Sequence, residues 1–277
     1  GTAAAFGGVT ESLKALGIPV GCCADGPSGI RMDCGTKAFS LPNGTLLGCT
    51  FNTELVGELY EMTGRELRLN KIDSLLGPGM NIHRNPLNGR NFEYISEDPL
   101  LTGRICAAQV KAMAKSEIGS TIKHFCGNNQ EVGRSTSDSV MSERCLREIY
   151  LKGFEIAITE SQPMSIMTSY NLINGVHAAN CEDTCTKAAR CEWGFQGVIM
   201  TDWTTTEYGP DCTASGCMRA GNDLVMPGAF SDRDNLNQEL ADGTLSMEDL
   251  KACISRLVNI TWQSMEFEDA APYKKVK

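Results

Sequence analysis

Histidine is scarce in this 277-residue sequence, and its few copies do not form a metal-binding pattern. The three histidines, His83, His124 and His177, stand in unrelated contexts, whereas a metal-dependent barrel hydrolase needs several His and Asp ligands at its strand ends. The 13 cysteines are numerous, but none of their spacings matches a pair of Cys-x-x-Cys knuckles. We therefore predict a protein that binds neither a metal ion nor another cofactor.

Long apolar runs and an excess of positive charge are also absent. No apolar run approaches the roughly 20 residues of a membrane span, and no signal-peptide pattern opens the chain. The formal net charge of −9 argues against a nucleic acid or an anionic membrane as partner. Because the cysteine count is odd and several cysteines lie in apolar segments, we expect reduced thiols and a cytoplasmic location.

Short apolar segments alternate with amphipathic ones along most of the chain, which is typical of βα units and a parallel sheet. Strands are expected at residues 20–24, 41–49 (after a short loop), 73–76, 120–123, 165–169, 198–201 and 223–226. Helices are expected at residues 9–16, from 52, at 100–114, 142–160, 182–191 and 212–220, and from 246.

This alternation predicts an α/β fold of the TIM-like (β/α)8 type, incomplete or irregular at its N-terminal end. No Gly-x-Gly-x-x-Gly follows the first strand, and polar residues follow nearly every strand, so a doubly wound dinucleotide-binding sheet fits less well. The eighth strand is either missing or lies in the opening residues. We expect one barrel domain at residues 1–265, of a length usual for such barrels, followed by a polar tail at residues 266–277.

Polar and aromatic side chains follow the expected strands and should meet at one mouth of the barrel. They are Asp25, Arg90, Lys123, His124, Tyr170, Asp202 and Trp203. Each alone has a purely structural explanation; Asp202, for example, could cap the next helix. Together they place hydrogen-bonding groups beside a flat indole, an inventory that suits the hydroxyls and CH face of a pyranose ring. A Gly-rich phosphate cradle is absent.

Five segments resemble, in order, the motifs of the barrel domain of glycoside hydrolase family 3. They are Ala-Asp-Gly-Pro-Ser-Gly-Ile-Arg at 24–31, Gly-Arg-Asn-Phe-Glu-Tyr-Ile-Ser-Glu-Asp-Pro at 89–99, Lys-His-Phe-Cys-Gly-Asn-Asn-Gln-Glu at 123–131, Met-Thr-Ser-Tyr-Asn at 167–171 and Met-Thr-Asp-Trp at 200–203. The third segment resembles the β-glucosidase and β-xylosidase branch. The N-acetylglucosaminidase branch would place a catalytic His in that loop, and this sequence has none there.

The resemblance implies a role for each matching residue. Asp202 matches the family's nucleophile, which forms a covalent glycosyl-enzyme in the retaining mechanism. The residues that would hold the sugar are Asp25, Arg90, Lys123, His124, Tyr170 and Trp203, with Glu131 and Arg134 as supports behind them. Lys123 beside Asp25 would also keep that carboxylate ionised.

A retaining glycosidase also needs a general acid/base, which in this family usually belongs to a second α/β domain. The sequence contains no such domain, so we expect a second domain or chain to supply the acid/base. The expected function is an exo-acting hydrolase domain that removes terminal β-linked glucose or xylose from a β-glucoside or oligosaccharide. Two alternatives stay open: a carbohydrate-binding half-enzyme that is inactive alone, and a β-N-acetylglucosaminidase of the same family.

Overall fold

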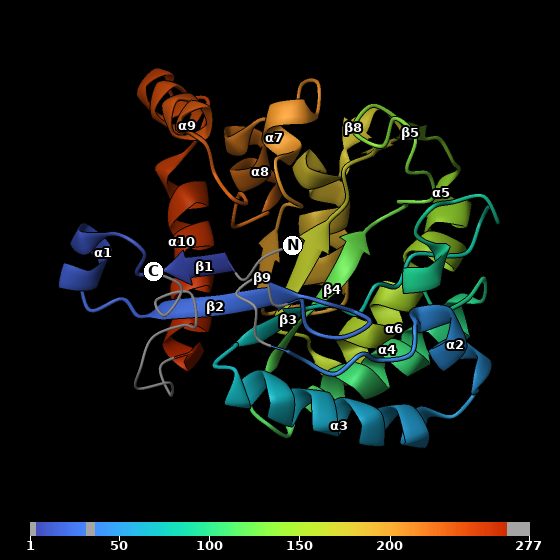
Figure 1. Ribbon diagram of the computed structural model, residues 1–277. Helices are drawn as coiled ribbons and strands as arrows, with labels where there is room; N and C mark the ends of the chain where they lie inside the picture. Colours follow the sequence, from blue (N-terminus) through green and yellow to red (C-terminus); the bar gives the residue numbers. More distant parts are fainter. Residues whose placement is uncertain (1–3, 32–36, 265–277) are drawn as a thin grey trace.

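The computed structural model describes residues 4–31 and 37–264, which contain one six-stranded sheet (Figure 1). Its strands, in spatial order, are β1 (Ala4–Gly7), β2 (Val20–Asp25), β3 (Ser74–Leu76), β4 (Gly119–Phe125), β6 (Ser165–Thr168) and β9 (Val198–Met200). Strand β1 runs antiparallel to β2, and every other neighbouring pair is parallel. The predicted tail at residues 266–277 lies outside the described residues.

The helices lie between these strands and after them. They are α1 (Glu11–Ala15), α2 (Gly44–Cys49), α3 (Thr53–Leu69), η1 (Asn91–Glu93), α4 (Pro99–Ala114), α5 (Glu143–Cys145), η2 (Leu146–Tyr150), α6 (Lys152–Ser161), η3 (Ala178–Asn180), η4 (Asp183–Glu192), α7 (Thr205–Tyr208), α8 (Ala214–Ala220), α9 (Phe230–Asp242) and α10 (Met247–Gln263). A small second sheet joins β5 (Asp138–Ser139), β7 (Leu172–Ile173) and β8 (Val176–His177). Among the described residues, no helix combines the length and the apolar character needed to cross a bilayer.

Both faces of the main sheet are buried, because successive side chains alternate between two apolar clusters. One face of the sheet packs on the surrounding helices: its residues Leu75, Ile122 and Ile199 belong to the larger cluster, which also holds buried residues of α3, α4 and α6. We call this face outward and the other face inward. Inward residues of β2, β3, β6 and β9 form a second cluster with Ile260 of α10. Because of this alternation, every second side chain at the strand ends points to the inward face, where these side chains can meet.

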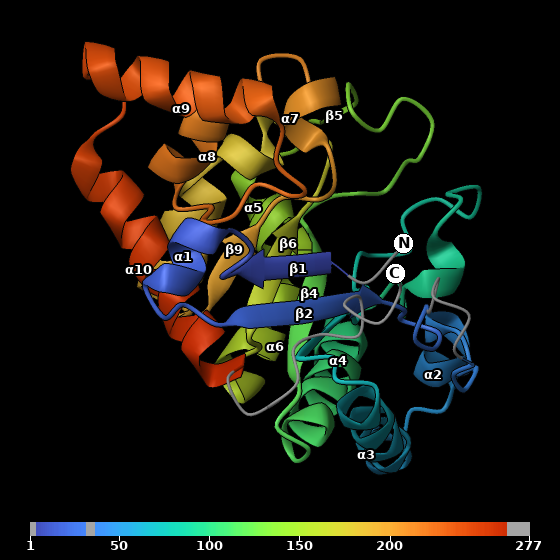
Figure 2. The same ribbon diagram turned by 60° about the vertical axis from the view of Figure 1, so that its left-hand side comes forward.

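Helix α10 packs between the two edge strands of the sheet, β1 and β9 (Figures 1 and 2). Phe6 of β1 and Val198 of β9 belong to the same inner cluster as Ile260 and the partly buried Leu257 of α10. A closed barrel would continue its ladder of strands across this gap. The fold is therefore a TIM-like α/β barrel that is incomplete, as predicted, with the additional N-terminal strand β1 running antiparallel.

Two of the expected strands are not present as predicted. Residues 41–49 contain the helix α2, because the Asn43 side chain accepts a hydrogen bond from Leu46 N at 2.9 Å and starts a helical turn. In residues 223–226 only a single parallel bridge joins Leu224 to Met200. There the Thr201 hydroxyl accepts from Met226 N at 2.8 Å in place of a backbone carbonyl. The expected helices at 142–160 and 182–191 are present with π turns.

A buried carboxylate, Asp73, lies at the start of β3 and ties it to β2. Its Oδ2 accepts a hydrogen bond from Cys22 N at 2.6 Å, and burial raises the pKa of Asp73 from 3.8 to about 7. Because the folded state then holds the proton more tightly than the unfolded state, stability falls as pH rises between these two values.

Replacing Asp73 by Asn should therefore raise the free energy of unfolding at neutral to mildly alkaline pH and leave it nearly unchanged near pH 4. We expect a gain of about 2 to 4 kcal/mol above the folded-state pKa. Urea unfolding at both pH values measures it, with the exposed Asp234→Asn as control. An equal effect at both pH values would show that the amide acts through packing rather than through charge.

Candidate active site

A pocket of about 640 Å³ opens at the carboxyl ends of β2, β4, β6 and β9. All seven residues predicted to form the sugar site line it, as does Arg134: Asp25, Arg90, Lys123, His124, Tyr170, Asp202 and Trp203. Glu131 is not part of the lining and lies behind it, bonded to Arg134. The structure thus gathers at one mouth side chains that are up to 178 residues apart (203 − 25).

Two carboxylates on one side of the pocket are held by basic side chains. Lys123 Nζ donates to Asp25 Oδ1 at 2.6 Å and lies 3.6 Å from Glu93 Oε1. Arg31 Nη1 reaches Asp25 Oδ2 at 3.0 Å, and Arg90 binds Glu93 through two bonds of 2.8 and 2.9 Å. Burial would raise the pKa of Asp25, but Lys123 and Arg31 outweigh it, so the pKa falls below its ordinary value. The predicted pairing of Lys123 with Asp25 is therefore observed.

Glu93 is a lining residue that sequence reasoning did not select. It lies in the 89–99 segment, three residues after Arg90, and a carboxylate and a guanidinium at this spacing in a helical turn are within bonding reach. Phe92, from the same turn, also lines the mouth and is 56% exposed, so it presents an apolar rim to anything that enters.

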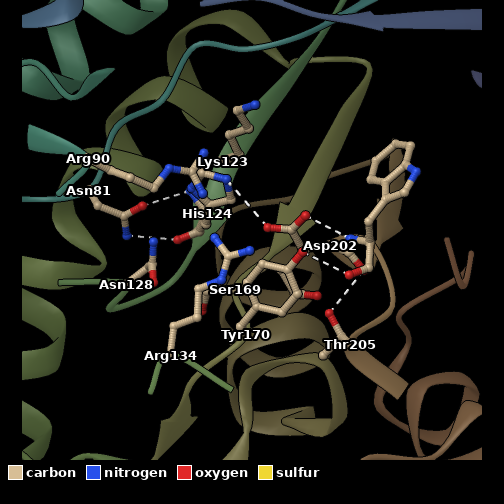
Figure 3. A network of polar contacts seen from close by, with 12 residues as sticks. Asn81, Arg90, Lys123, His124, Asn128, Arg134, Ser169, Tyr170, Asp202 and Thr205 are labelled. Atoms are coloured by element: carbon tan, nitrogen blue, oxygen red, sulfur yellow. Dashed lines mark hydrogen bonds and ion pairs between the residues drawn. The ribbon is translucent and has the colours of Figure 1, made fainter. Parts of the chain in front are cut away.

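Asp202 is buried at the end of β9, and its carboxylate faces the pocket (Figure 3). Its Oδ1 accepts a hydrogen bond from Trp203 N at 2.7 Å. Burial raises the pKa of Asp202, and Lys123 and Arg90 offset part of the rise. Helix α7 begins after Thr204 without a side-chain cap, so the alternative that Asp202 caps this helix is wrong.

Tyr170 and Trp203 lie beside Asp202. The Tyr170 hydroxyl donates to Trp203 O at 2.8 Å, which fixes the backbone of the residue that follows Asp202. The Arg134 guanidinium lies 4.2 Å above the Tyr170 ring and donates to Glu131 Oε2 at 2.9 Å. Burial, with Asp202 nearby, raises the pKa of Tyr170, so this hydroxyl keeps its proton.

His124 is a buried residue of β4 that lines the pocket, and both its backbone N–H and its backbone carbonyl are hydrogen-bonded. Asn81 Oδ1 accepts from His124 N and Asn81 Nδ2 donates to His124 O, each at 2.8 Å (Figure 3). Burial, with Arg90 and Lys123 nearby, lowers the pKa of His124 well below its ordinary value, so the ring is neutral at physiological pH. Its Nε2 lies 3.6 Å from Asp202 Oδ2, which is a polar contact rather than an ion pair or a full hydrogen bond.

An incomplete TIM-like barrel that gathers three carboxylates and an indole around one pocket has the architecture of a glycoside hydrolase barrel domain. Comparison with known families gives the particular family. The chain belongs to glycosyl hydrolase family 3, whose N terminal domain matches residues 7–260.

Relatives of known name agree with this assignment. The chain is 54% identical to a β-glucosidase of Ruminococcus albus, over 91% of this chain and 27% of that protein. It is 36% identical to an exo-α-(1→6)-L-arabinopyranosidase of Bifidobacterium longum, over 90% of this chain and 34% of that protein. It superposes on a β-glucosidase structure from Paenibacillus barengoltzii with a TM-score of 0.91 and 49% identity, covering 96% of this chain and 30% of the other. The chain thus spans about a third of the length of these relatives.

Proposed function

We propose that this chain is the nucleophile-bearing domain of a retaining, exo-acting glycoside hydrolase that removes terminal β-linked glucose or xylose. One observation supports this most directly. Of the three carboxylates that line the pocket among the described residues, Asp202 alone has no Lys or Arg ion partner. A carboxylate whose oxygen is not held by a cation is the one available to attack.

In this mechanism a carboxylate oxygen of Asp202 attacks the anomeric carbon while the bond to the leaving-group oxygen breaks. A glycosyl ester of Asp202 forms, and a water molecule then hydrolyses it with net retention of configuration. Asp25 offers an acceptor to the sugar hydroxyls, and its partner Lys123 offers a donor. Arg90 and His124 offer further donors. Trp203 offers a flat apolar surface to the CH face of the ring.

The acid/base is proposed to come from another domain or chain. Retaining enzymes place their two carboxyl groups about 5 to 5.5 Å apart, and one of them must carry a proton in the first step. Lys123 and Arg31 hold the pKa of Asp25 below its ordinary value, so Asp25 does not carry the proton, and both oxygens of Glu93 accept hydrogen bonds from Arg90. Residues 1–265 are then the barrel domain of a longer enzyme whose α/β domain completes the site, in keeping with the share of its relatives that the chain spans.

A cytoplasmic location is also proposed. Twelve of the 13 cysteines lie in the described residues, and all twelve are free thiols. Most are buried in the apolar clusters, where burial raises the pKa of thiols such as Cys106 and Cys126 and keeps them protonated and unreactive. A reducing compartment maintains this state.

The test is a burst experiment on this chain with 2,4-dinitrophenyl glycosides and intact-mass analysis. A leaving group of low pKa needs no proton donor, so the first step should proceed without the acid/base. We expect one glycosyl residue per chain from the β-glucoside or β-xyloside. The α-L-arabinopyranoside, tested in parallel, represents the sugar named for the Bifidobacterium longum relative. The β-N-acetylglucosaminide tests the alternative of a β-N-acetylglucosaminidase.

Calorimetric titration with free glucose separates the remaining outcomes. Sugar binding without any adduct would favour the carbohydrate-binding half-enzyme. A folded chain that neither binds sugar nor forms an adduct would overturn the proposal for the isolated domain.

A further inference from the structure

A series of hydrogen bonds connects Arg134 to His124, two residues of the pocket lining. Arg134 Nη1 donates to Glu131 Oε2 at 2.9 Å, and Glu131 Oε1 accepts from Asn128 Nδ2 at 3.0 Å. The same Asn128 Nδ2 lies 2.9 Å from the Tyr94 hydroxyl oxygen, which lies 3.1 Å from His124 Nδ1. Asn128, Tyr94 and His124 are each at most 1% exposed, so water does not offer them other partners.

The chemistry of these groups gives the series one direction. Glu131 forms an ion pair with Arg134 and offers its other carboxylate oxygen as an acceptor, so the amino group of Asn128 must face it. That amino group therefore also faces Tyr94 and donates its second hydrogen to the phenolic oxygen. The Tyr94 proton is left for the remaining neighbour, His124 Nδ1. Burial raises the pKa of Tyr94, so the hydroxyl keeps that proton.

We propose that Tyr94 is a positioning residue that holds His124 in the neutral tautomer protonated at Nε2. Nδ1 accepts from Tyr94, so the ring proton is on Nε2, which points toward Asp202 Oδ2 at 3.6 Å. Asn81 holds the backbone of His124 on both sides and so limits rotation of the residue. Glu131, which lies behind the lining, and Arg134, which is part of it, act on His124 through this series.

The tautomer decides what His124 presents to the pocket. With Nε2 protonated, the ring offers a donor beside the carboxylate of Asp202 and to any hydroxyl placed between them. With Nδ1 protonated, a lone pair would face the carboxylate, and both groups would be acceptors. The consequence for catalysis rests on the proposed function, whereas the tautomer itself does not.

The first test is a long-range ¹H–¹⁵N spectrum of the full chain labelled at its histidine nitrogens. The sequence has three histidines, and replacing His83 and His177 singly by Gln assigns the signals of His124. We expect the protonated-nitrogen shift at Nε2 and the unprotonated shift at Nδ1 at neutral pH. A protonated Nδ1 in the unmodified protein would overturn the proposal.

Two variants test whether the series sets this tautomer. In Asn128→Asp, the group facing Tyr94 becomes an acceptor, so Tyr94 should donate to it and His124 should become protonated at Nδ1. In Tyr94→Phe, both tautomers should be populated. Retention of the Nε2-protonated form alone in both variants, with native-like spectra elsewhere, would overturn the proposal. Should Asn128→Asp fail to fold, Tyr94→Phe and the unmodified protein still decide it.

Tyr60→Phe is the matched control, because Tyr60 is a buried tyrosine whose hydroxyl donates to Pro27 O at 3.0 Å, away from His124. It should leave the His124 tautomer unchanged.

The rate of glycosylation of Asp202 should fall about 10- to 100-fold in Tyr94→Phe, as for a lost hydrogen bond near a charge. If no adduct forms in any protein, the proposed function fails while the tautomer result stands; if adducts form at equal rates, the tautomer has no role in the first step.

Discussion

Asp202→Asn is expected to slow formation of the glycosyl adduct by about 10⁴-fold or more, as for loss of a catalytic nucleophile. The amide is a far weaker nucleophile, and none of the other lining carboxylates is free of a basic partner among the described residues. The rate is followed by intact mass with the dinitrophenyl glucoside. Asp211→Asn, which removes an exposed carboxylate from the following loop, should react at the unmodified rate.

The same substitution is expected to stabilise the fold at neutral pH. Burial raises the pKa of Asp202, so the folded state binds its proton more tightly than the unfolded state does. The free energy of unfolding therefore falls as pH rises from the ordinary pKa through the raised one, and Asn removes this cost. We expect Tm to be higher in Asp202→Asn at neutral pH, with the difference shrinking in acid. A lower Tm at neutral pH would show that the carboxylate is structural.

Azide provides a chemical check on the face of attack. In Asp202→Gly the missing side chain leaves room for a small anion on the face of the sugar that Asp202 would attack. Azide should restore turnover of the dinitrophenyl β-glucoside and give the α-glycosyl azide, since a single displacement inverts configuration. A β-configured product would place the nucleophile elsewhere.

The site was largely predictable from the sequence because its members stand at the ends of strands. Asp25 and Lys123 each lie in the inward series of their strand, so period-2 alternation places both in one interior. The order of the five family motifs along the chain then indicated which polar residues form one site. This is why Asp25 and Lys123 line the same pocket.

What the sequence did not predict depends on contacts between distant segments. Tyr94 is separated by 30 residues from His124 and by 34 from Asn128, and nothing in the local pattern of either segment marks a hydrogen bond between them. Helix α2 was missed because Leu46 and Leu47 read as an apolar strand, whereas the Asn43 cap favours a helix. Helix α9 was not predicted because its apolar stripe is short: Leu236 and Leu240 are only partly buried, and its one fully buried residue is Asp232.

The fold also depends on Asp223, a buried carboxylate that is not part of the pocket lining. Its side chain is fully buried and accepts from Arg190 Nη2 at 2.5 Å, Arg256 Nε at 2.7 Å and Ile199 N at 2.8 Å. It thereby connects η4 and α10 to β9, the strand that leads to Asp202. Burial raises the pKa of Asp223, and the two arginines offset part of the rise. Burying the charges of Asp223, Arg190 and Arg256 costs free energy, and the cost is offset only while the carboxylate and the guanidinium groups remain paired.

Asp223→Ala is therefore expected to lower the free energy of unfolding by about 3 to 5 kcal/mol, because it leaves two partly buried guanidinium groups facing each other. Denaturant unfolding should show a lower midpoint with an unchanged slope. Asp234→Ala, which removes one partner of an exposed pair with Arg233, should cost no more than about 1 kcal/mol.

A further variant separates the charge effect from the lost backbone contact. Adding Arg190→Met to Asp223→Ala removes one of the unpaired cations and should recover part of the loss, although Ile199 N still lacks its acceptor. If the double variant is less stable than Asp223→Ala, the bonds from Arg190 to the carbonyls of Gly197 and Gly221 outweigh the charge it carries. Arg190 would then stabilise the start of β9 directly, and Asp223 would serve mainly to neutralise it.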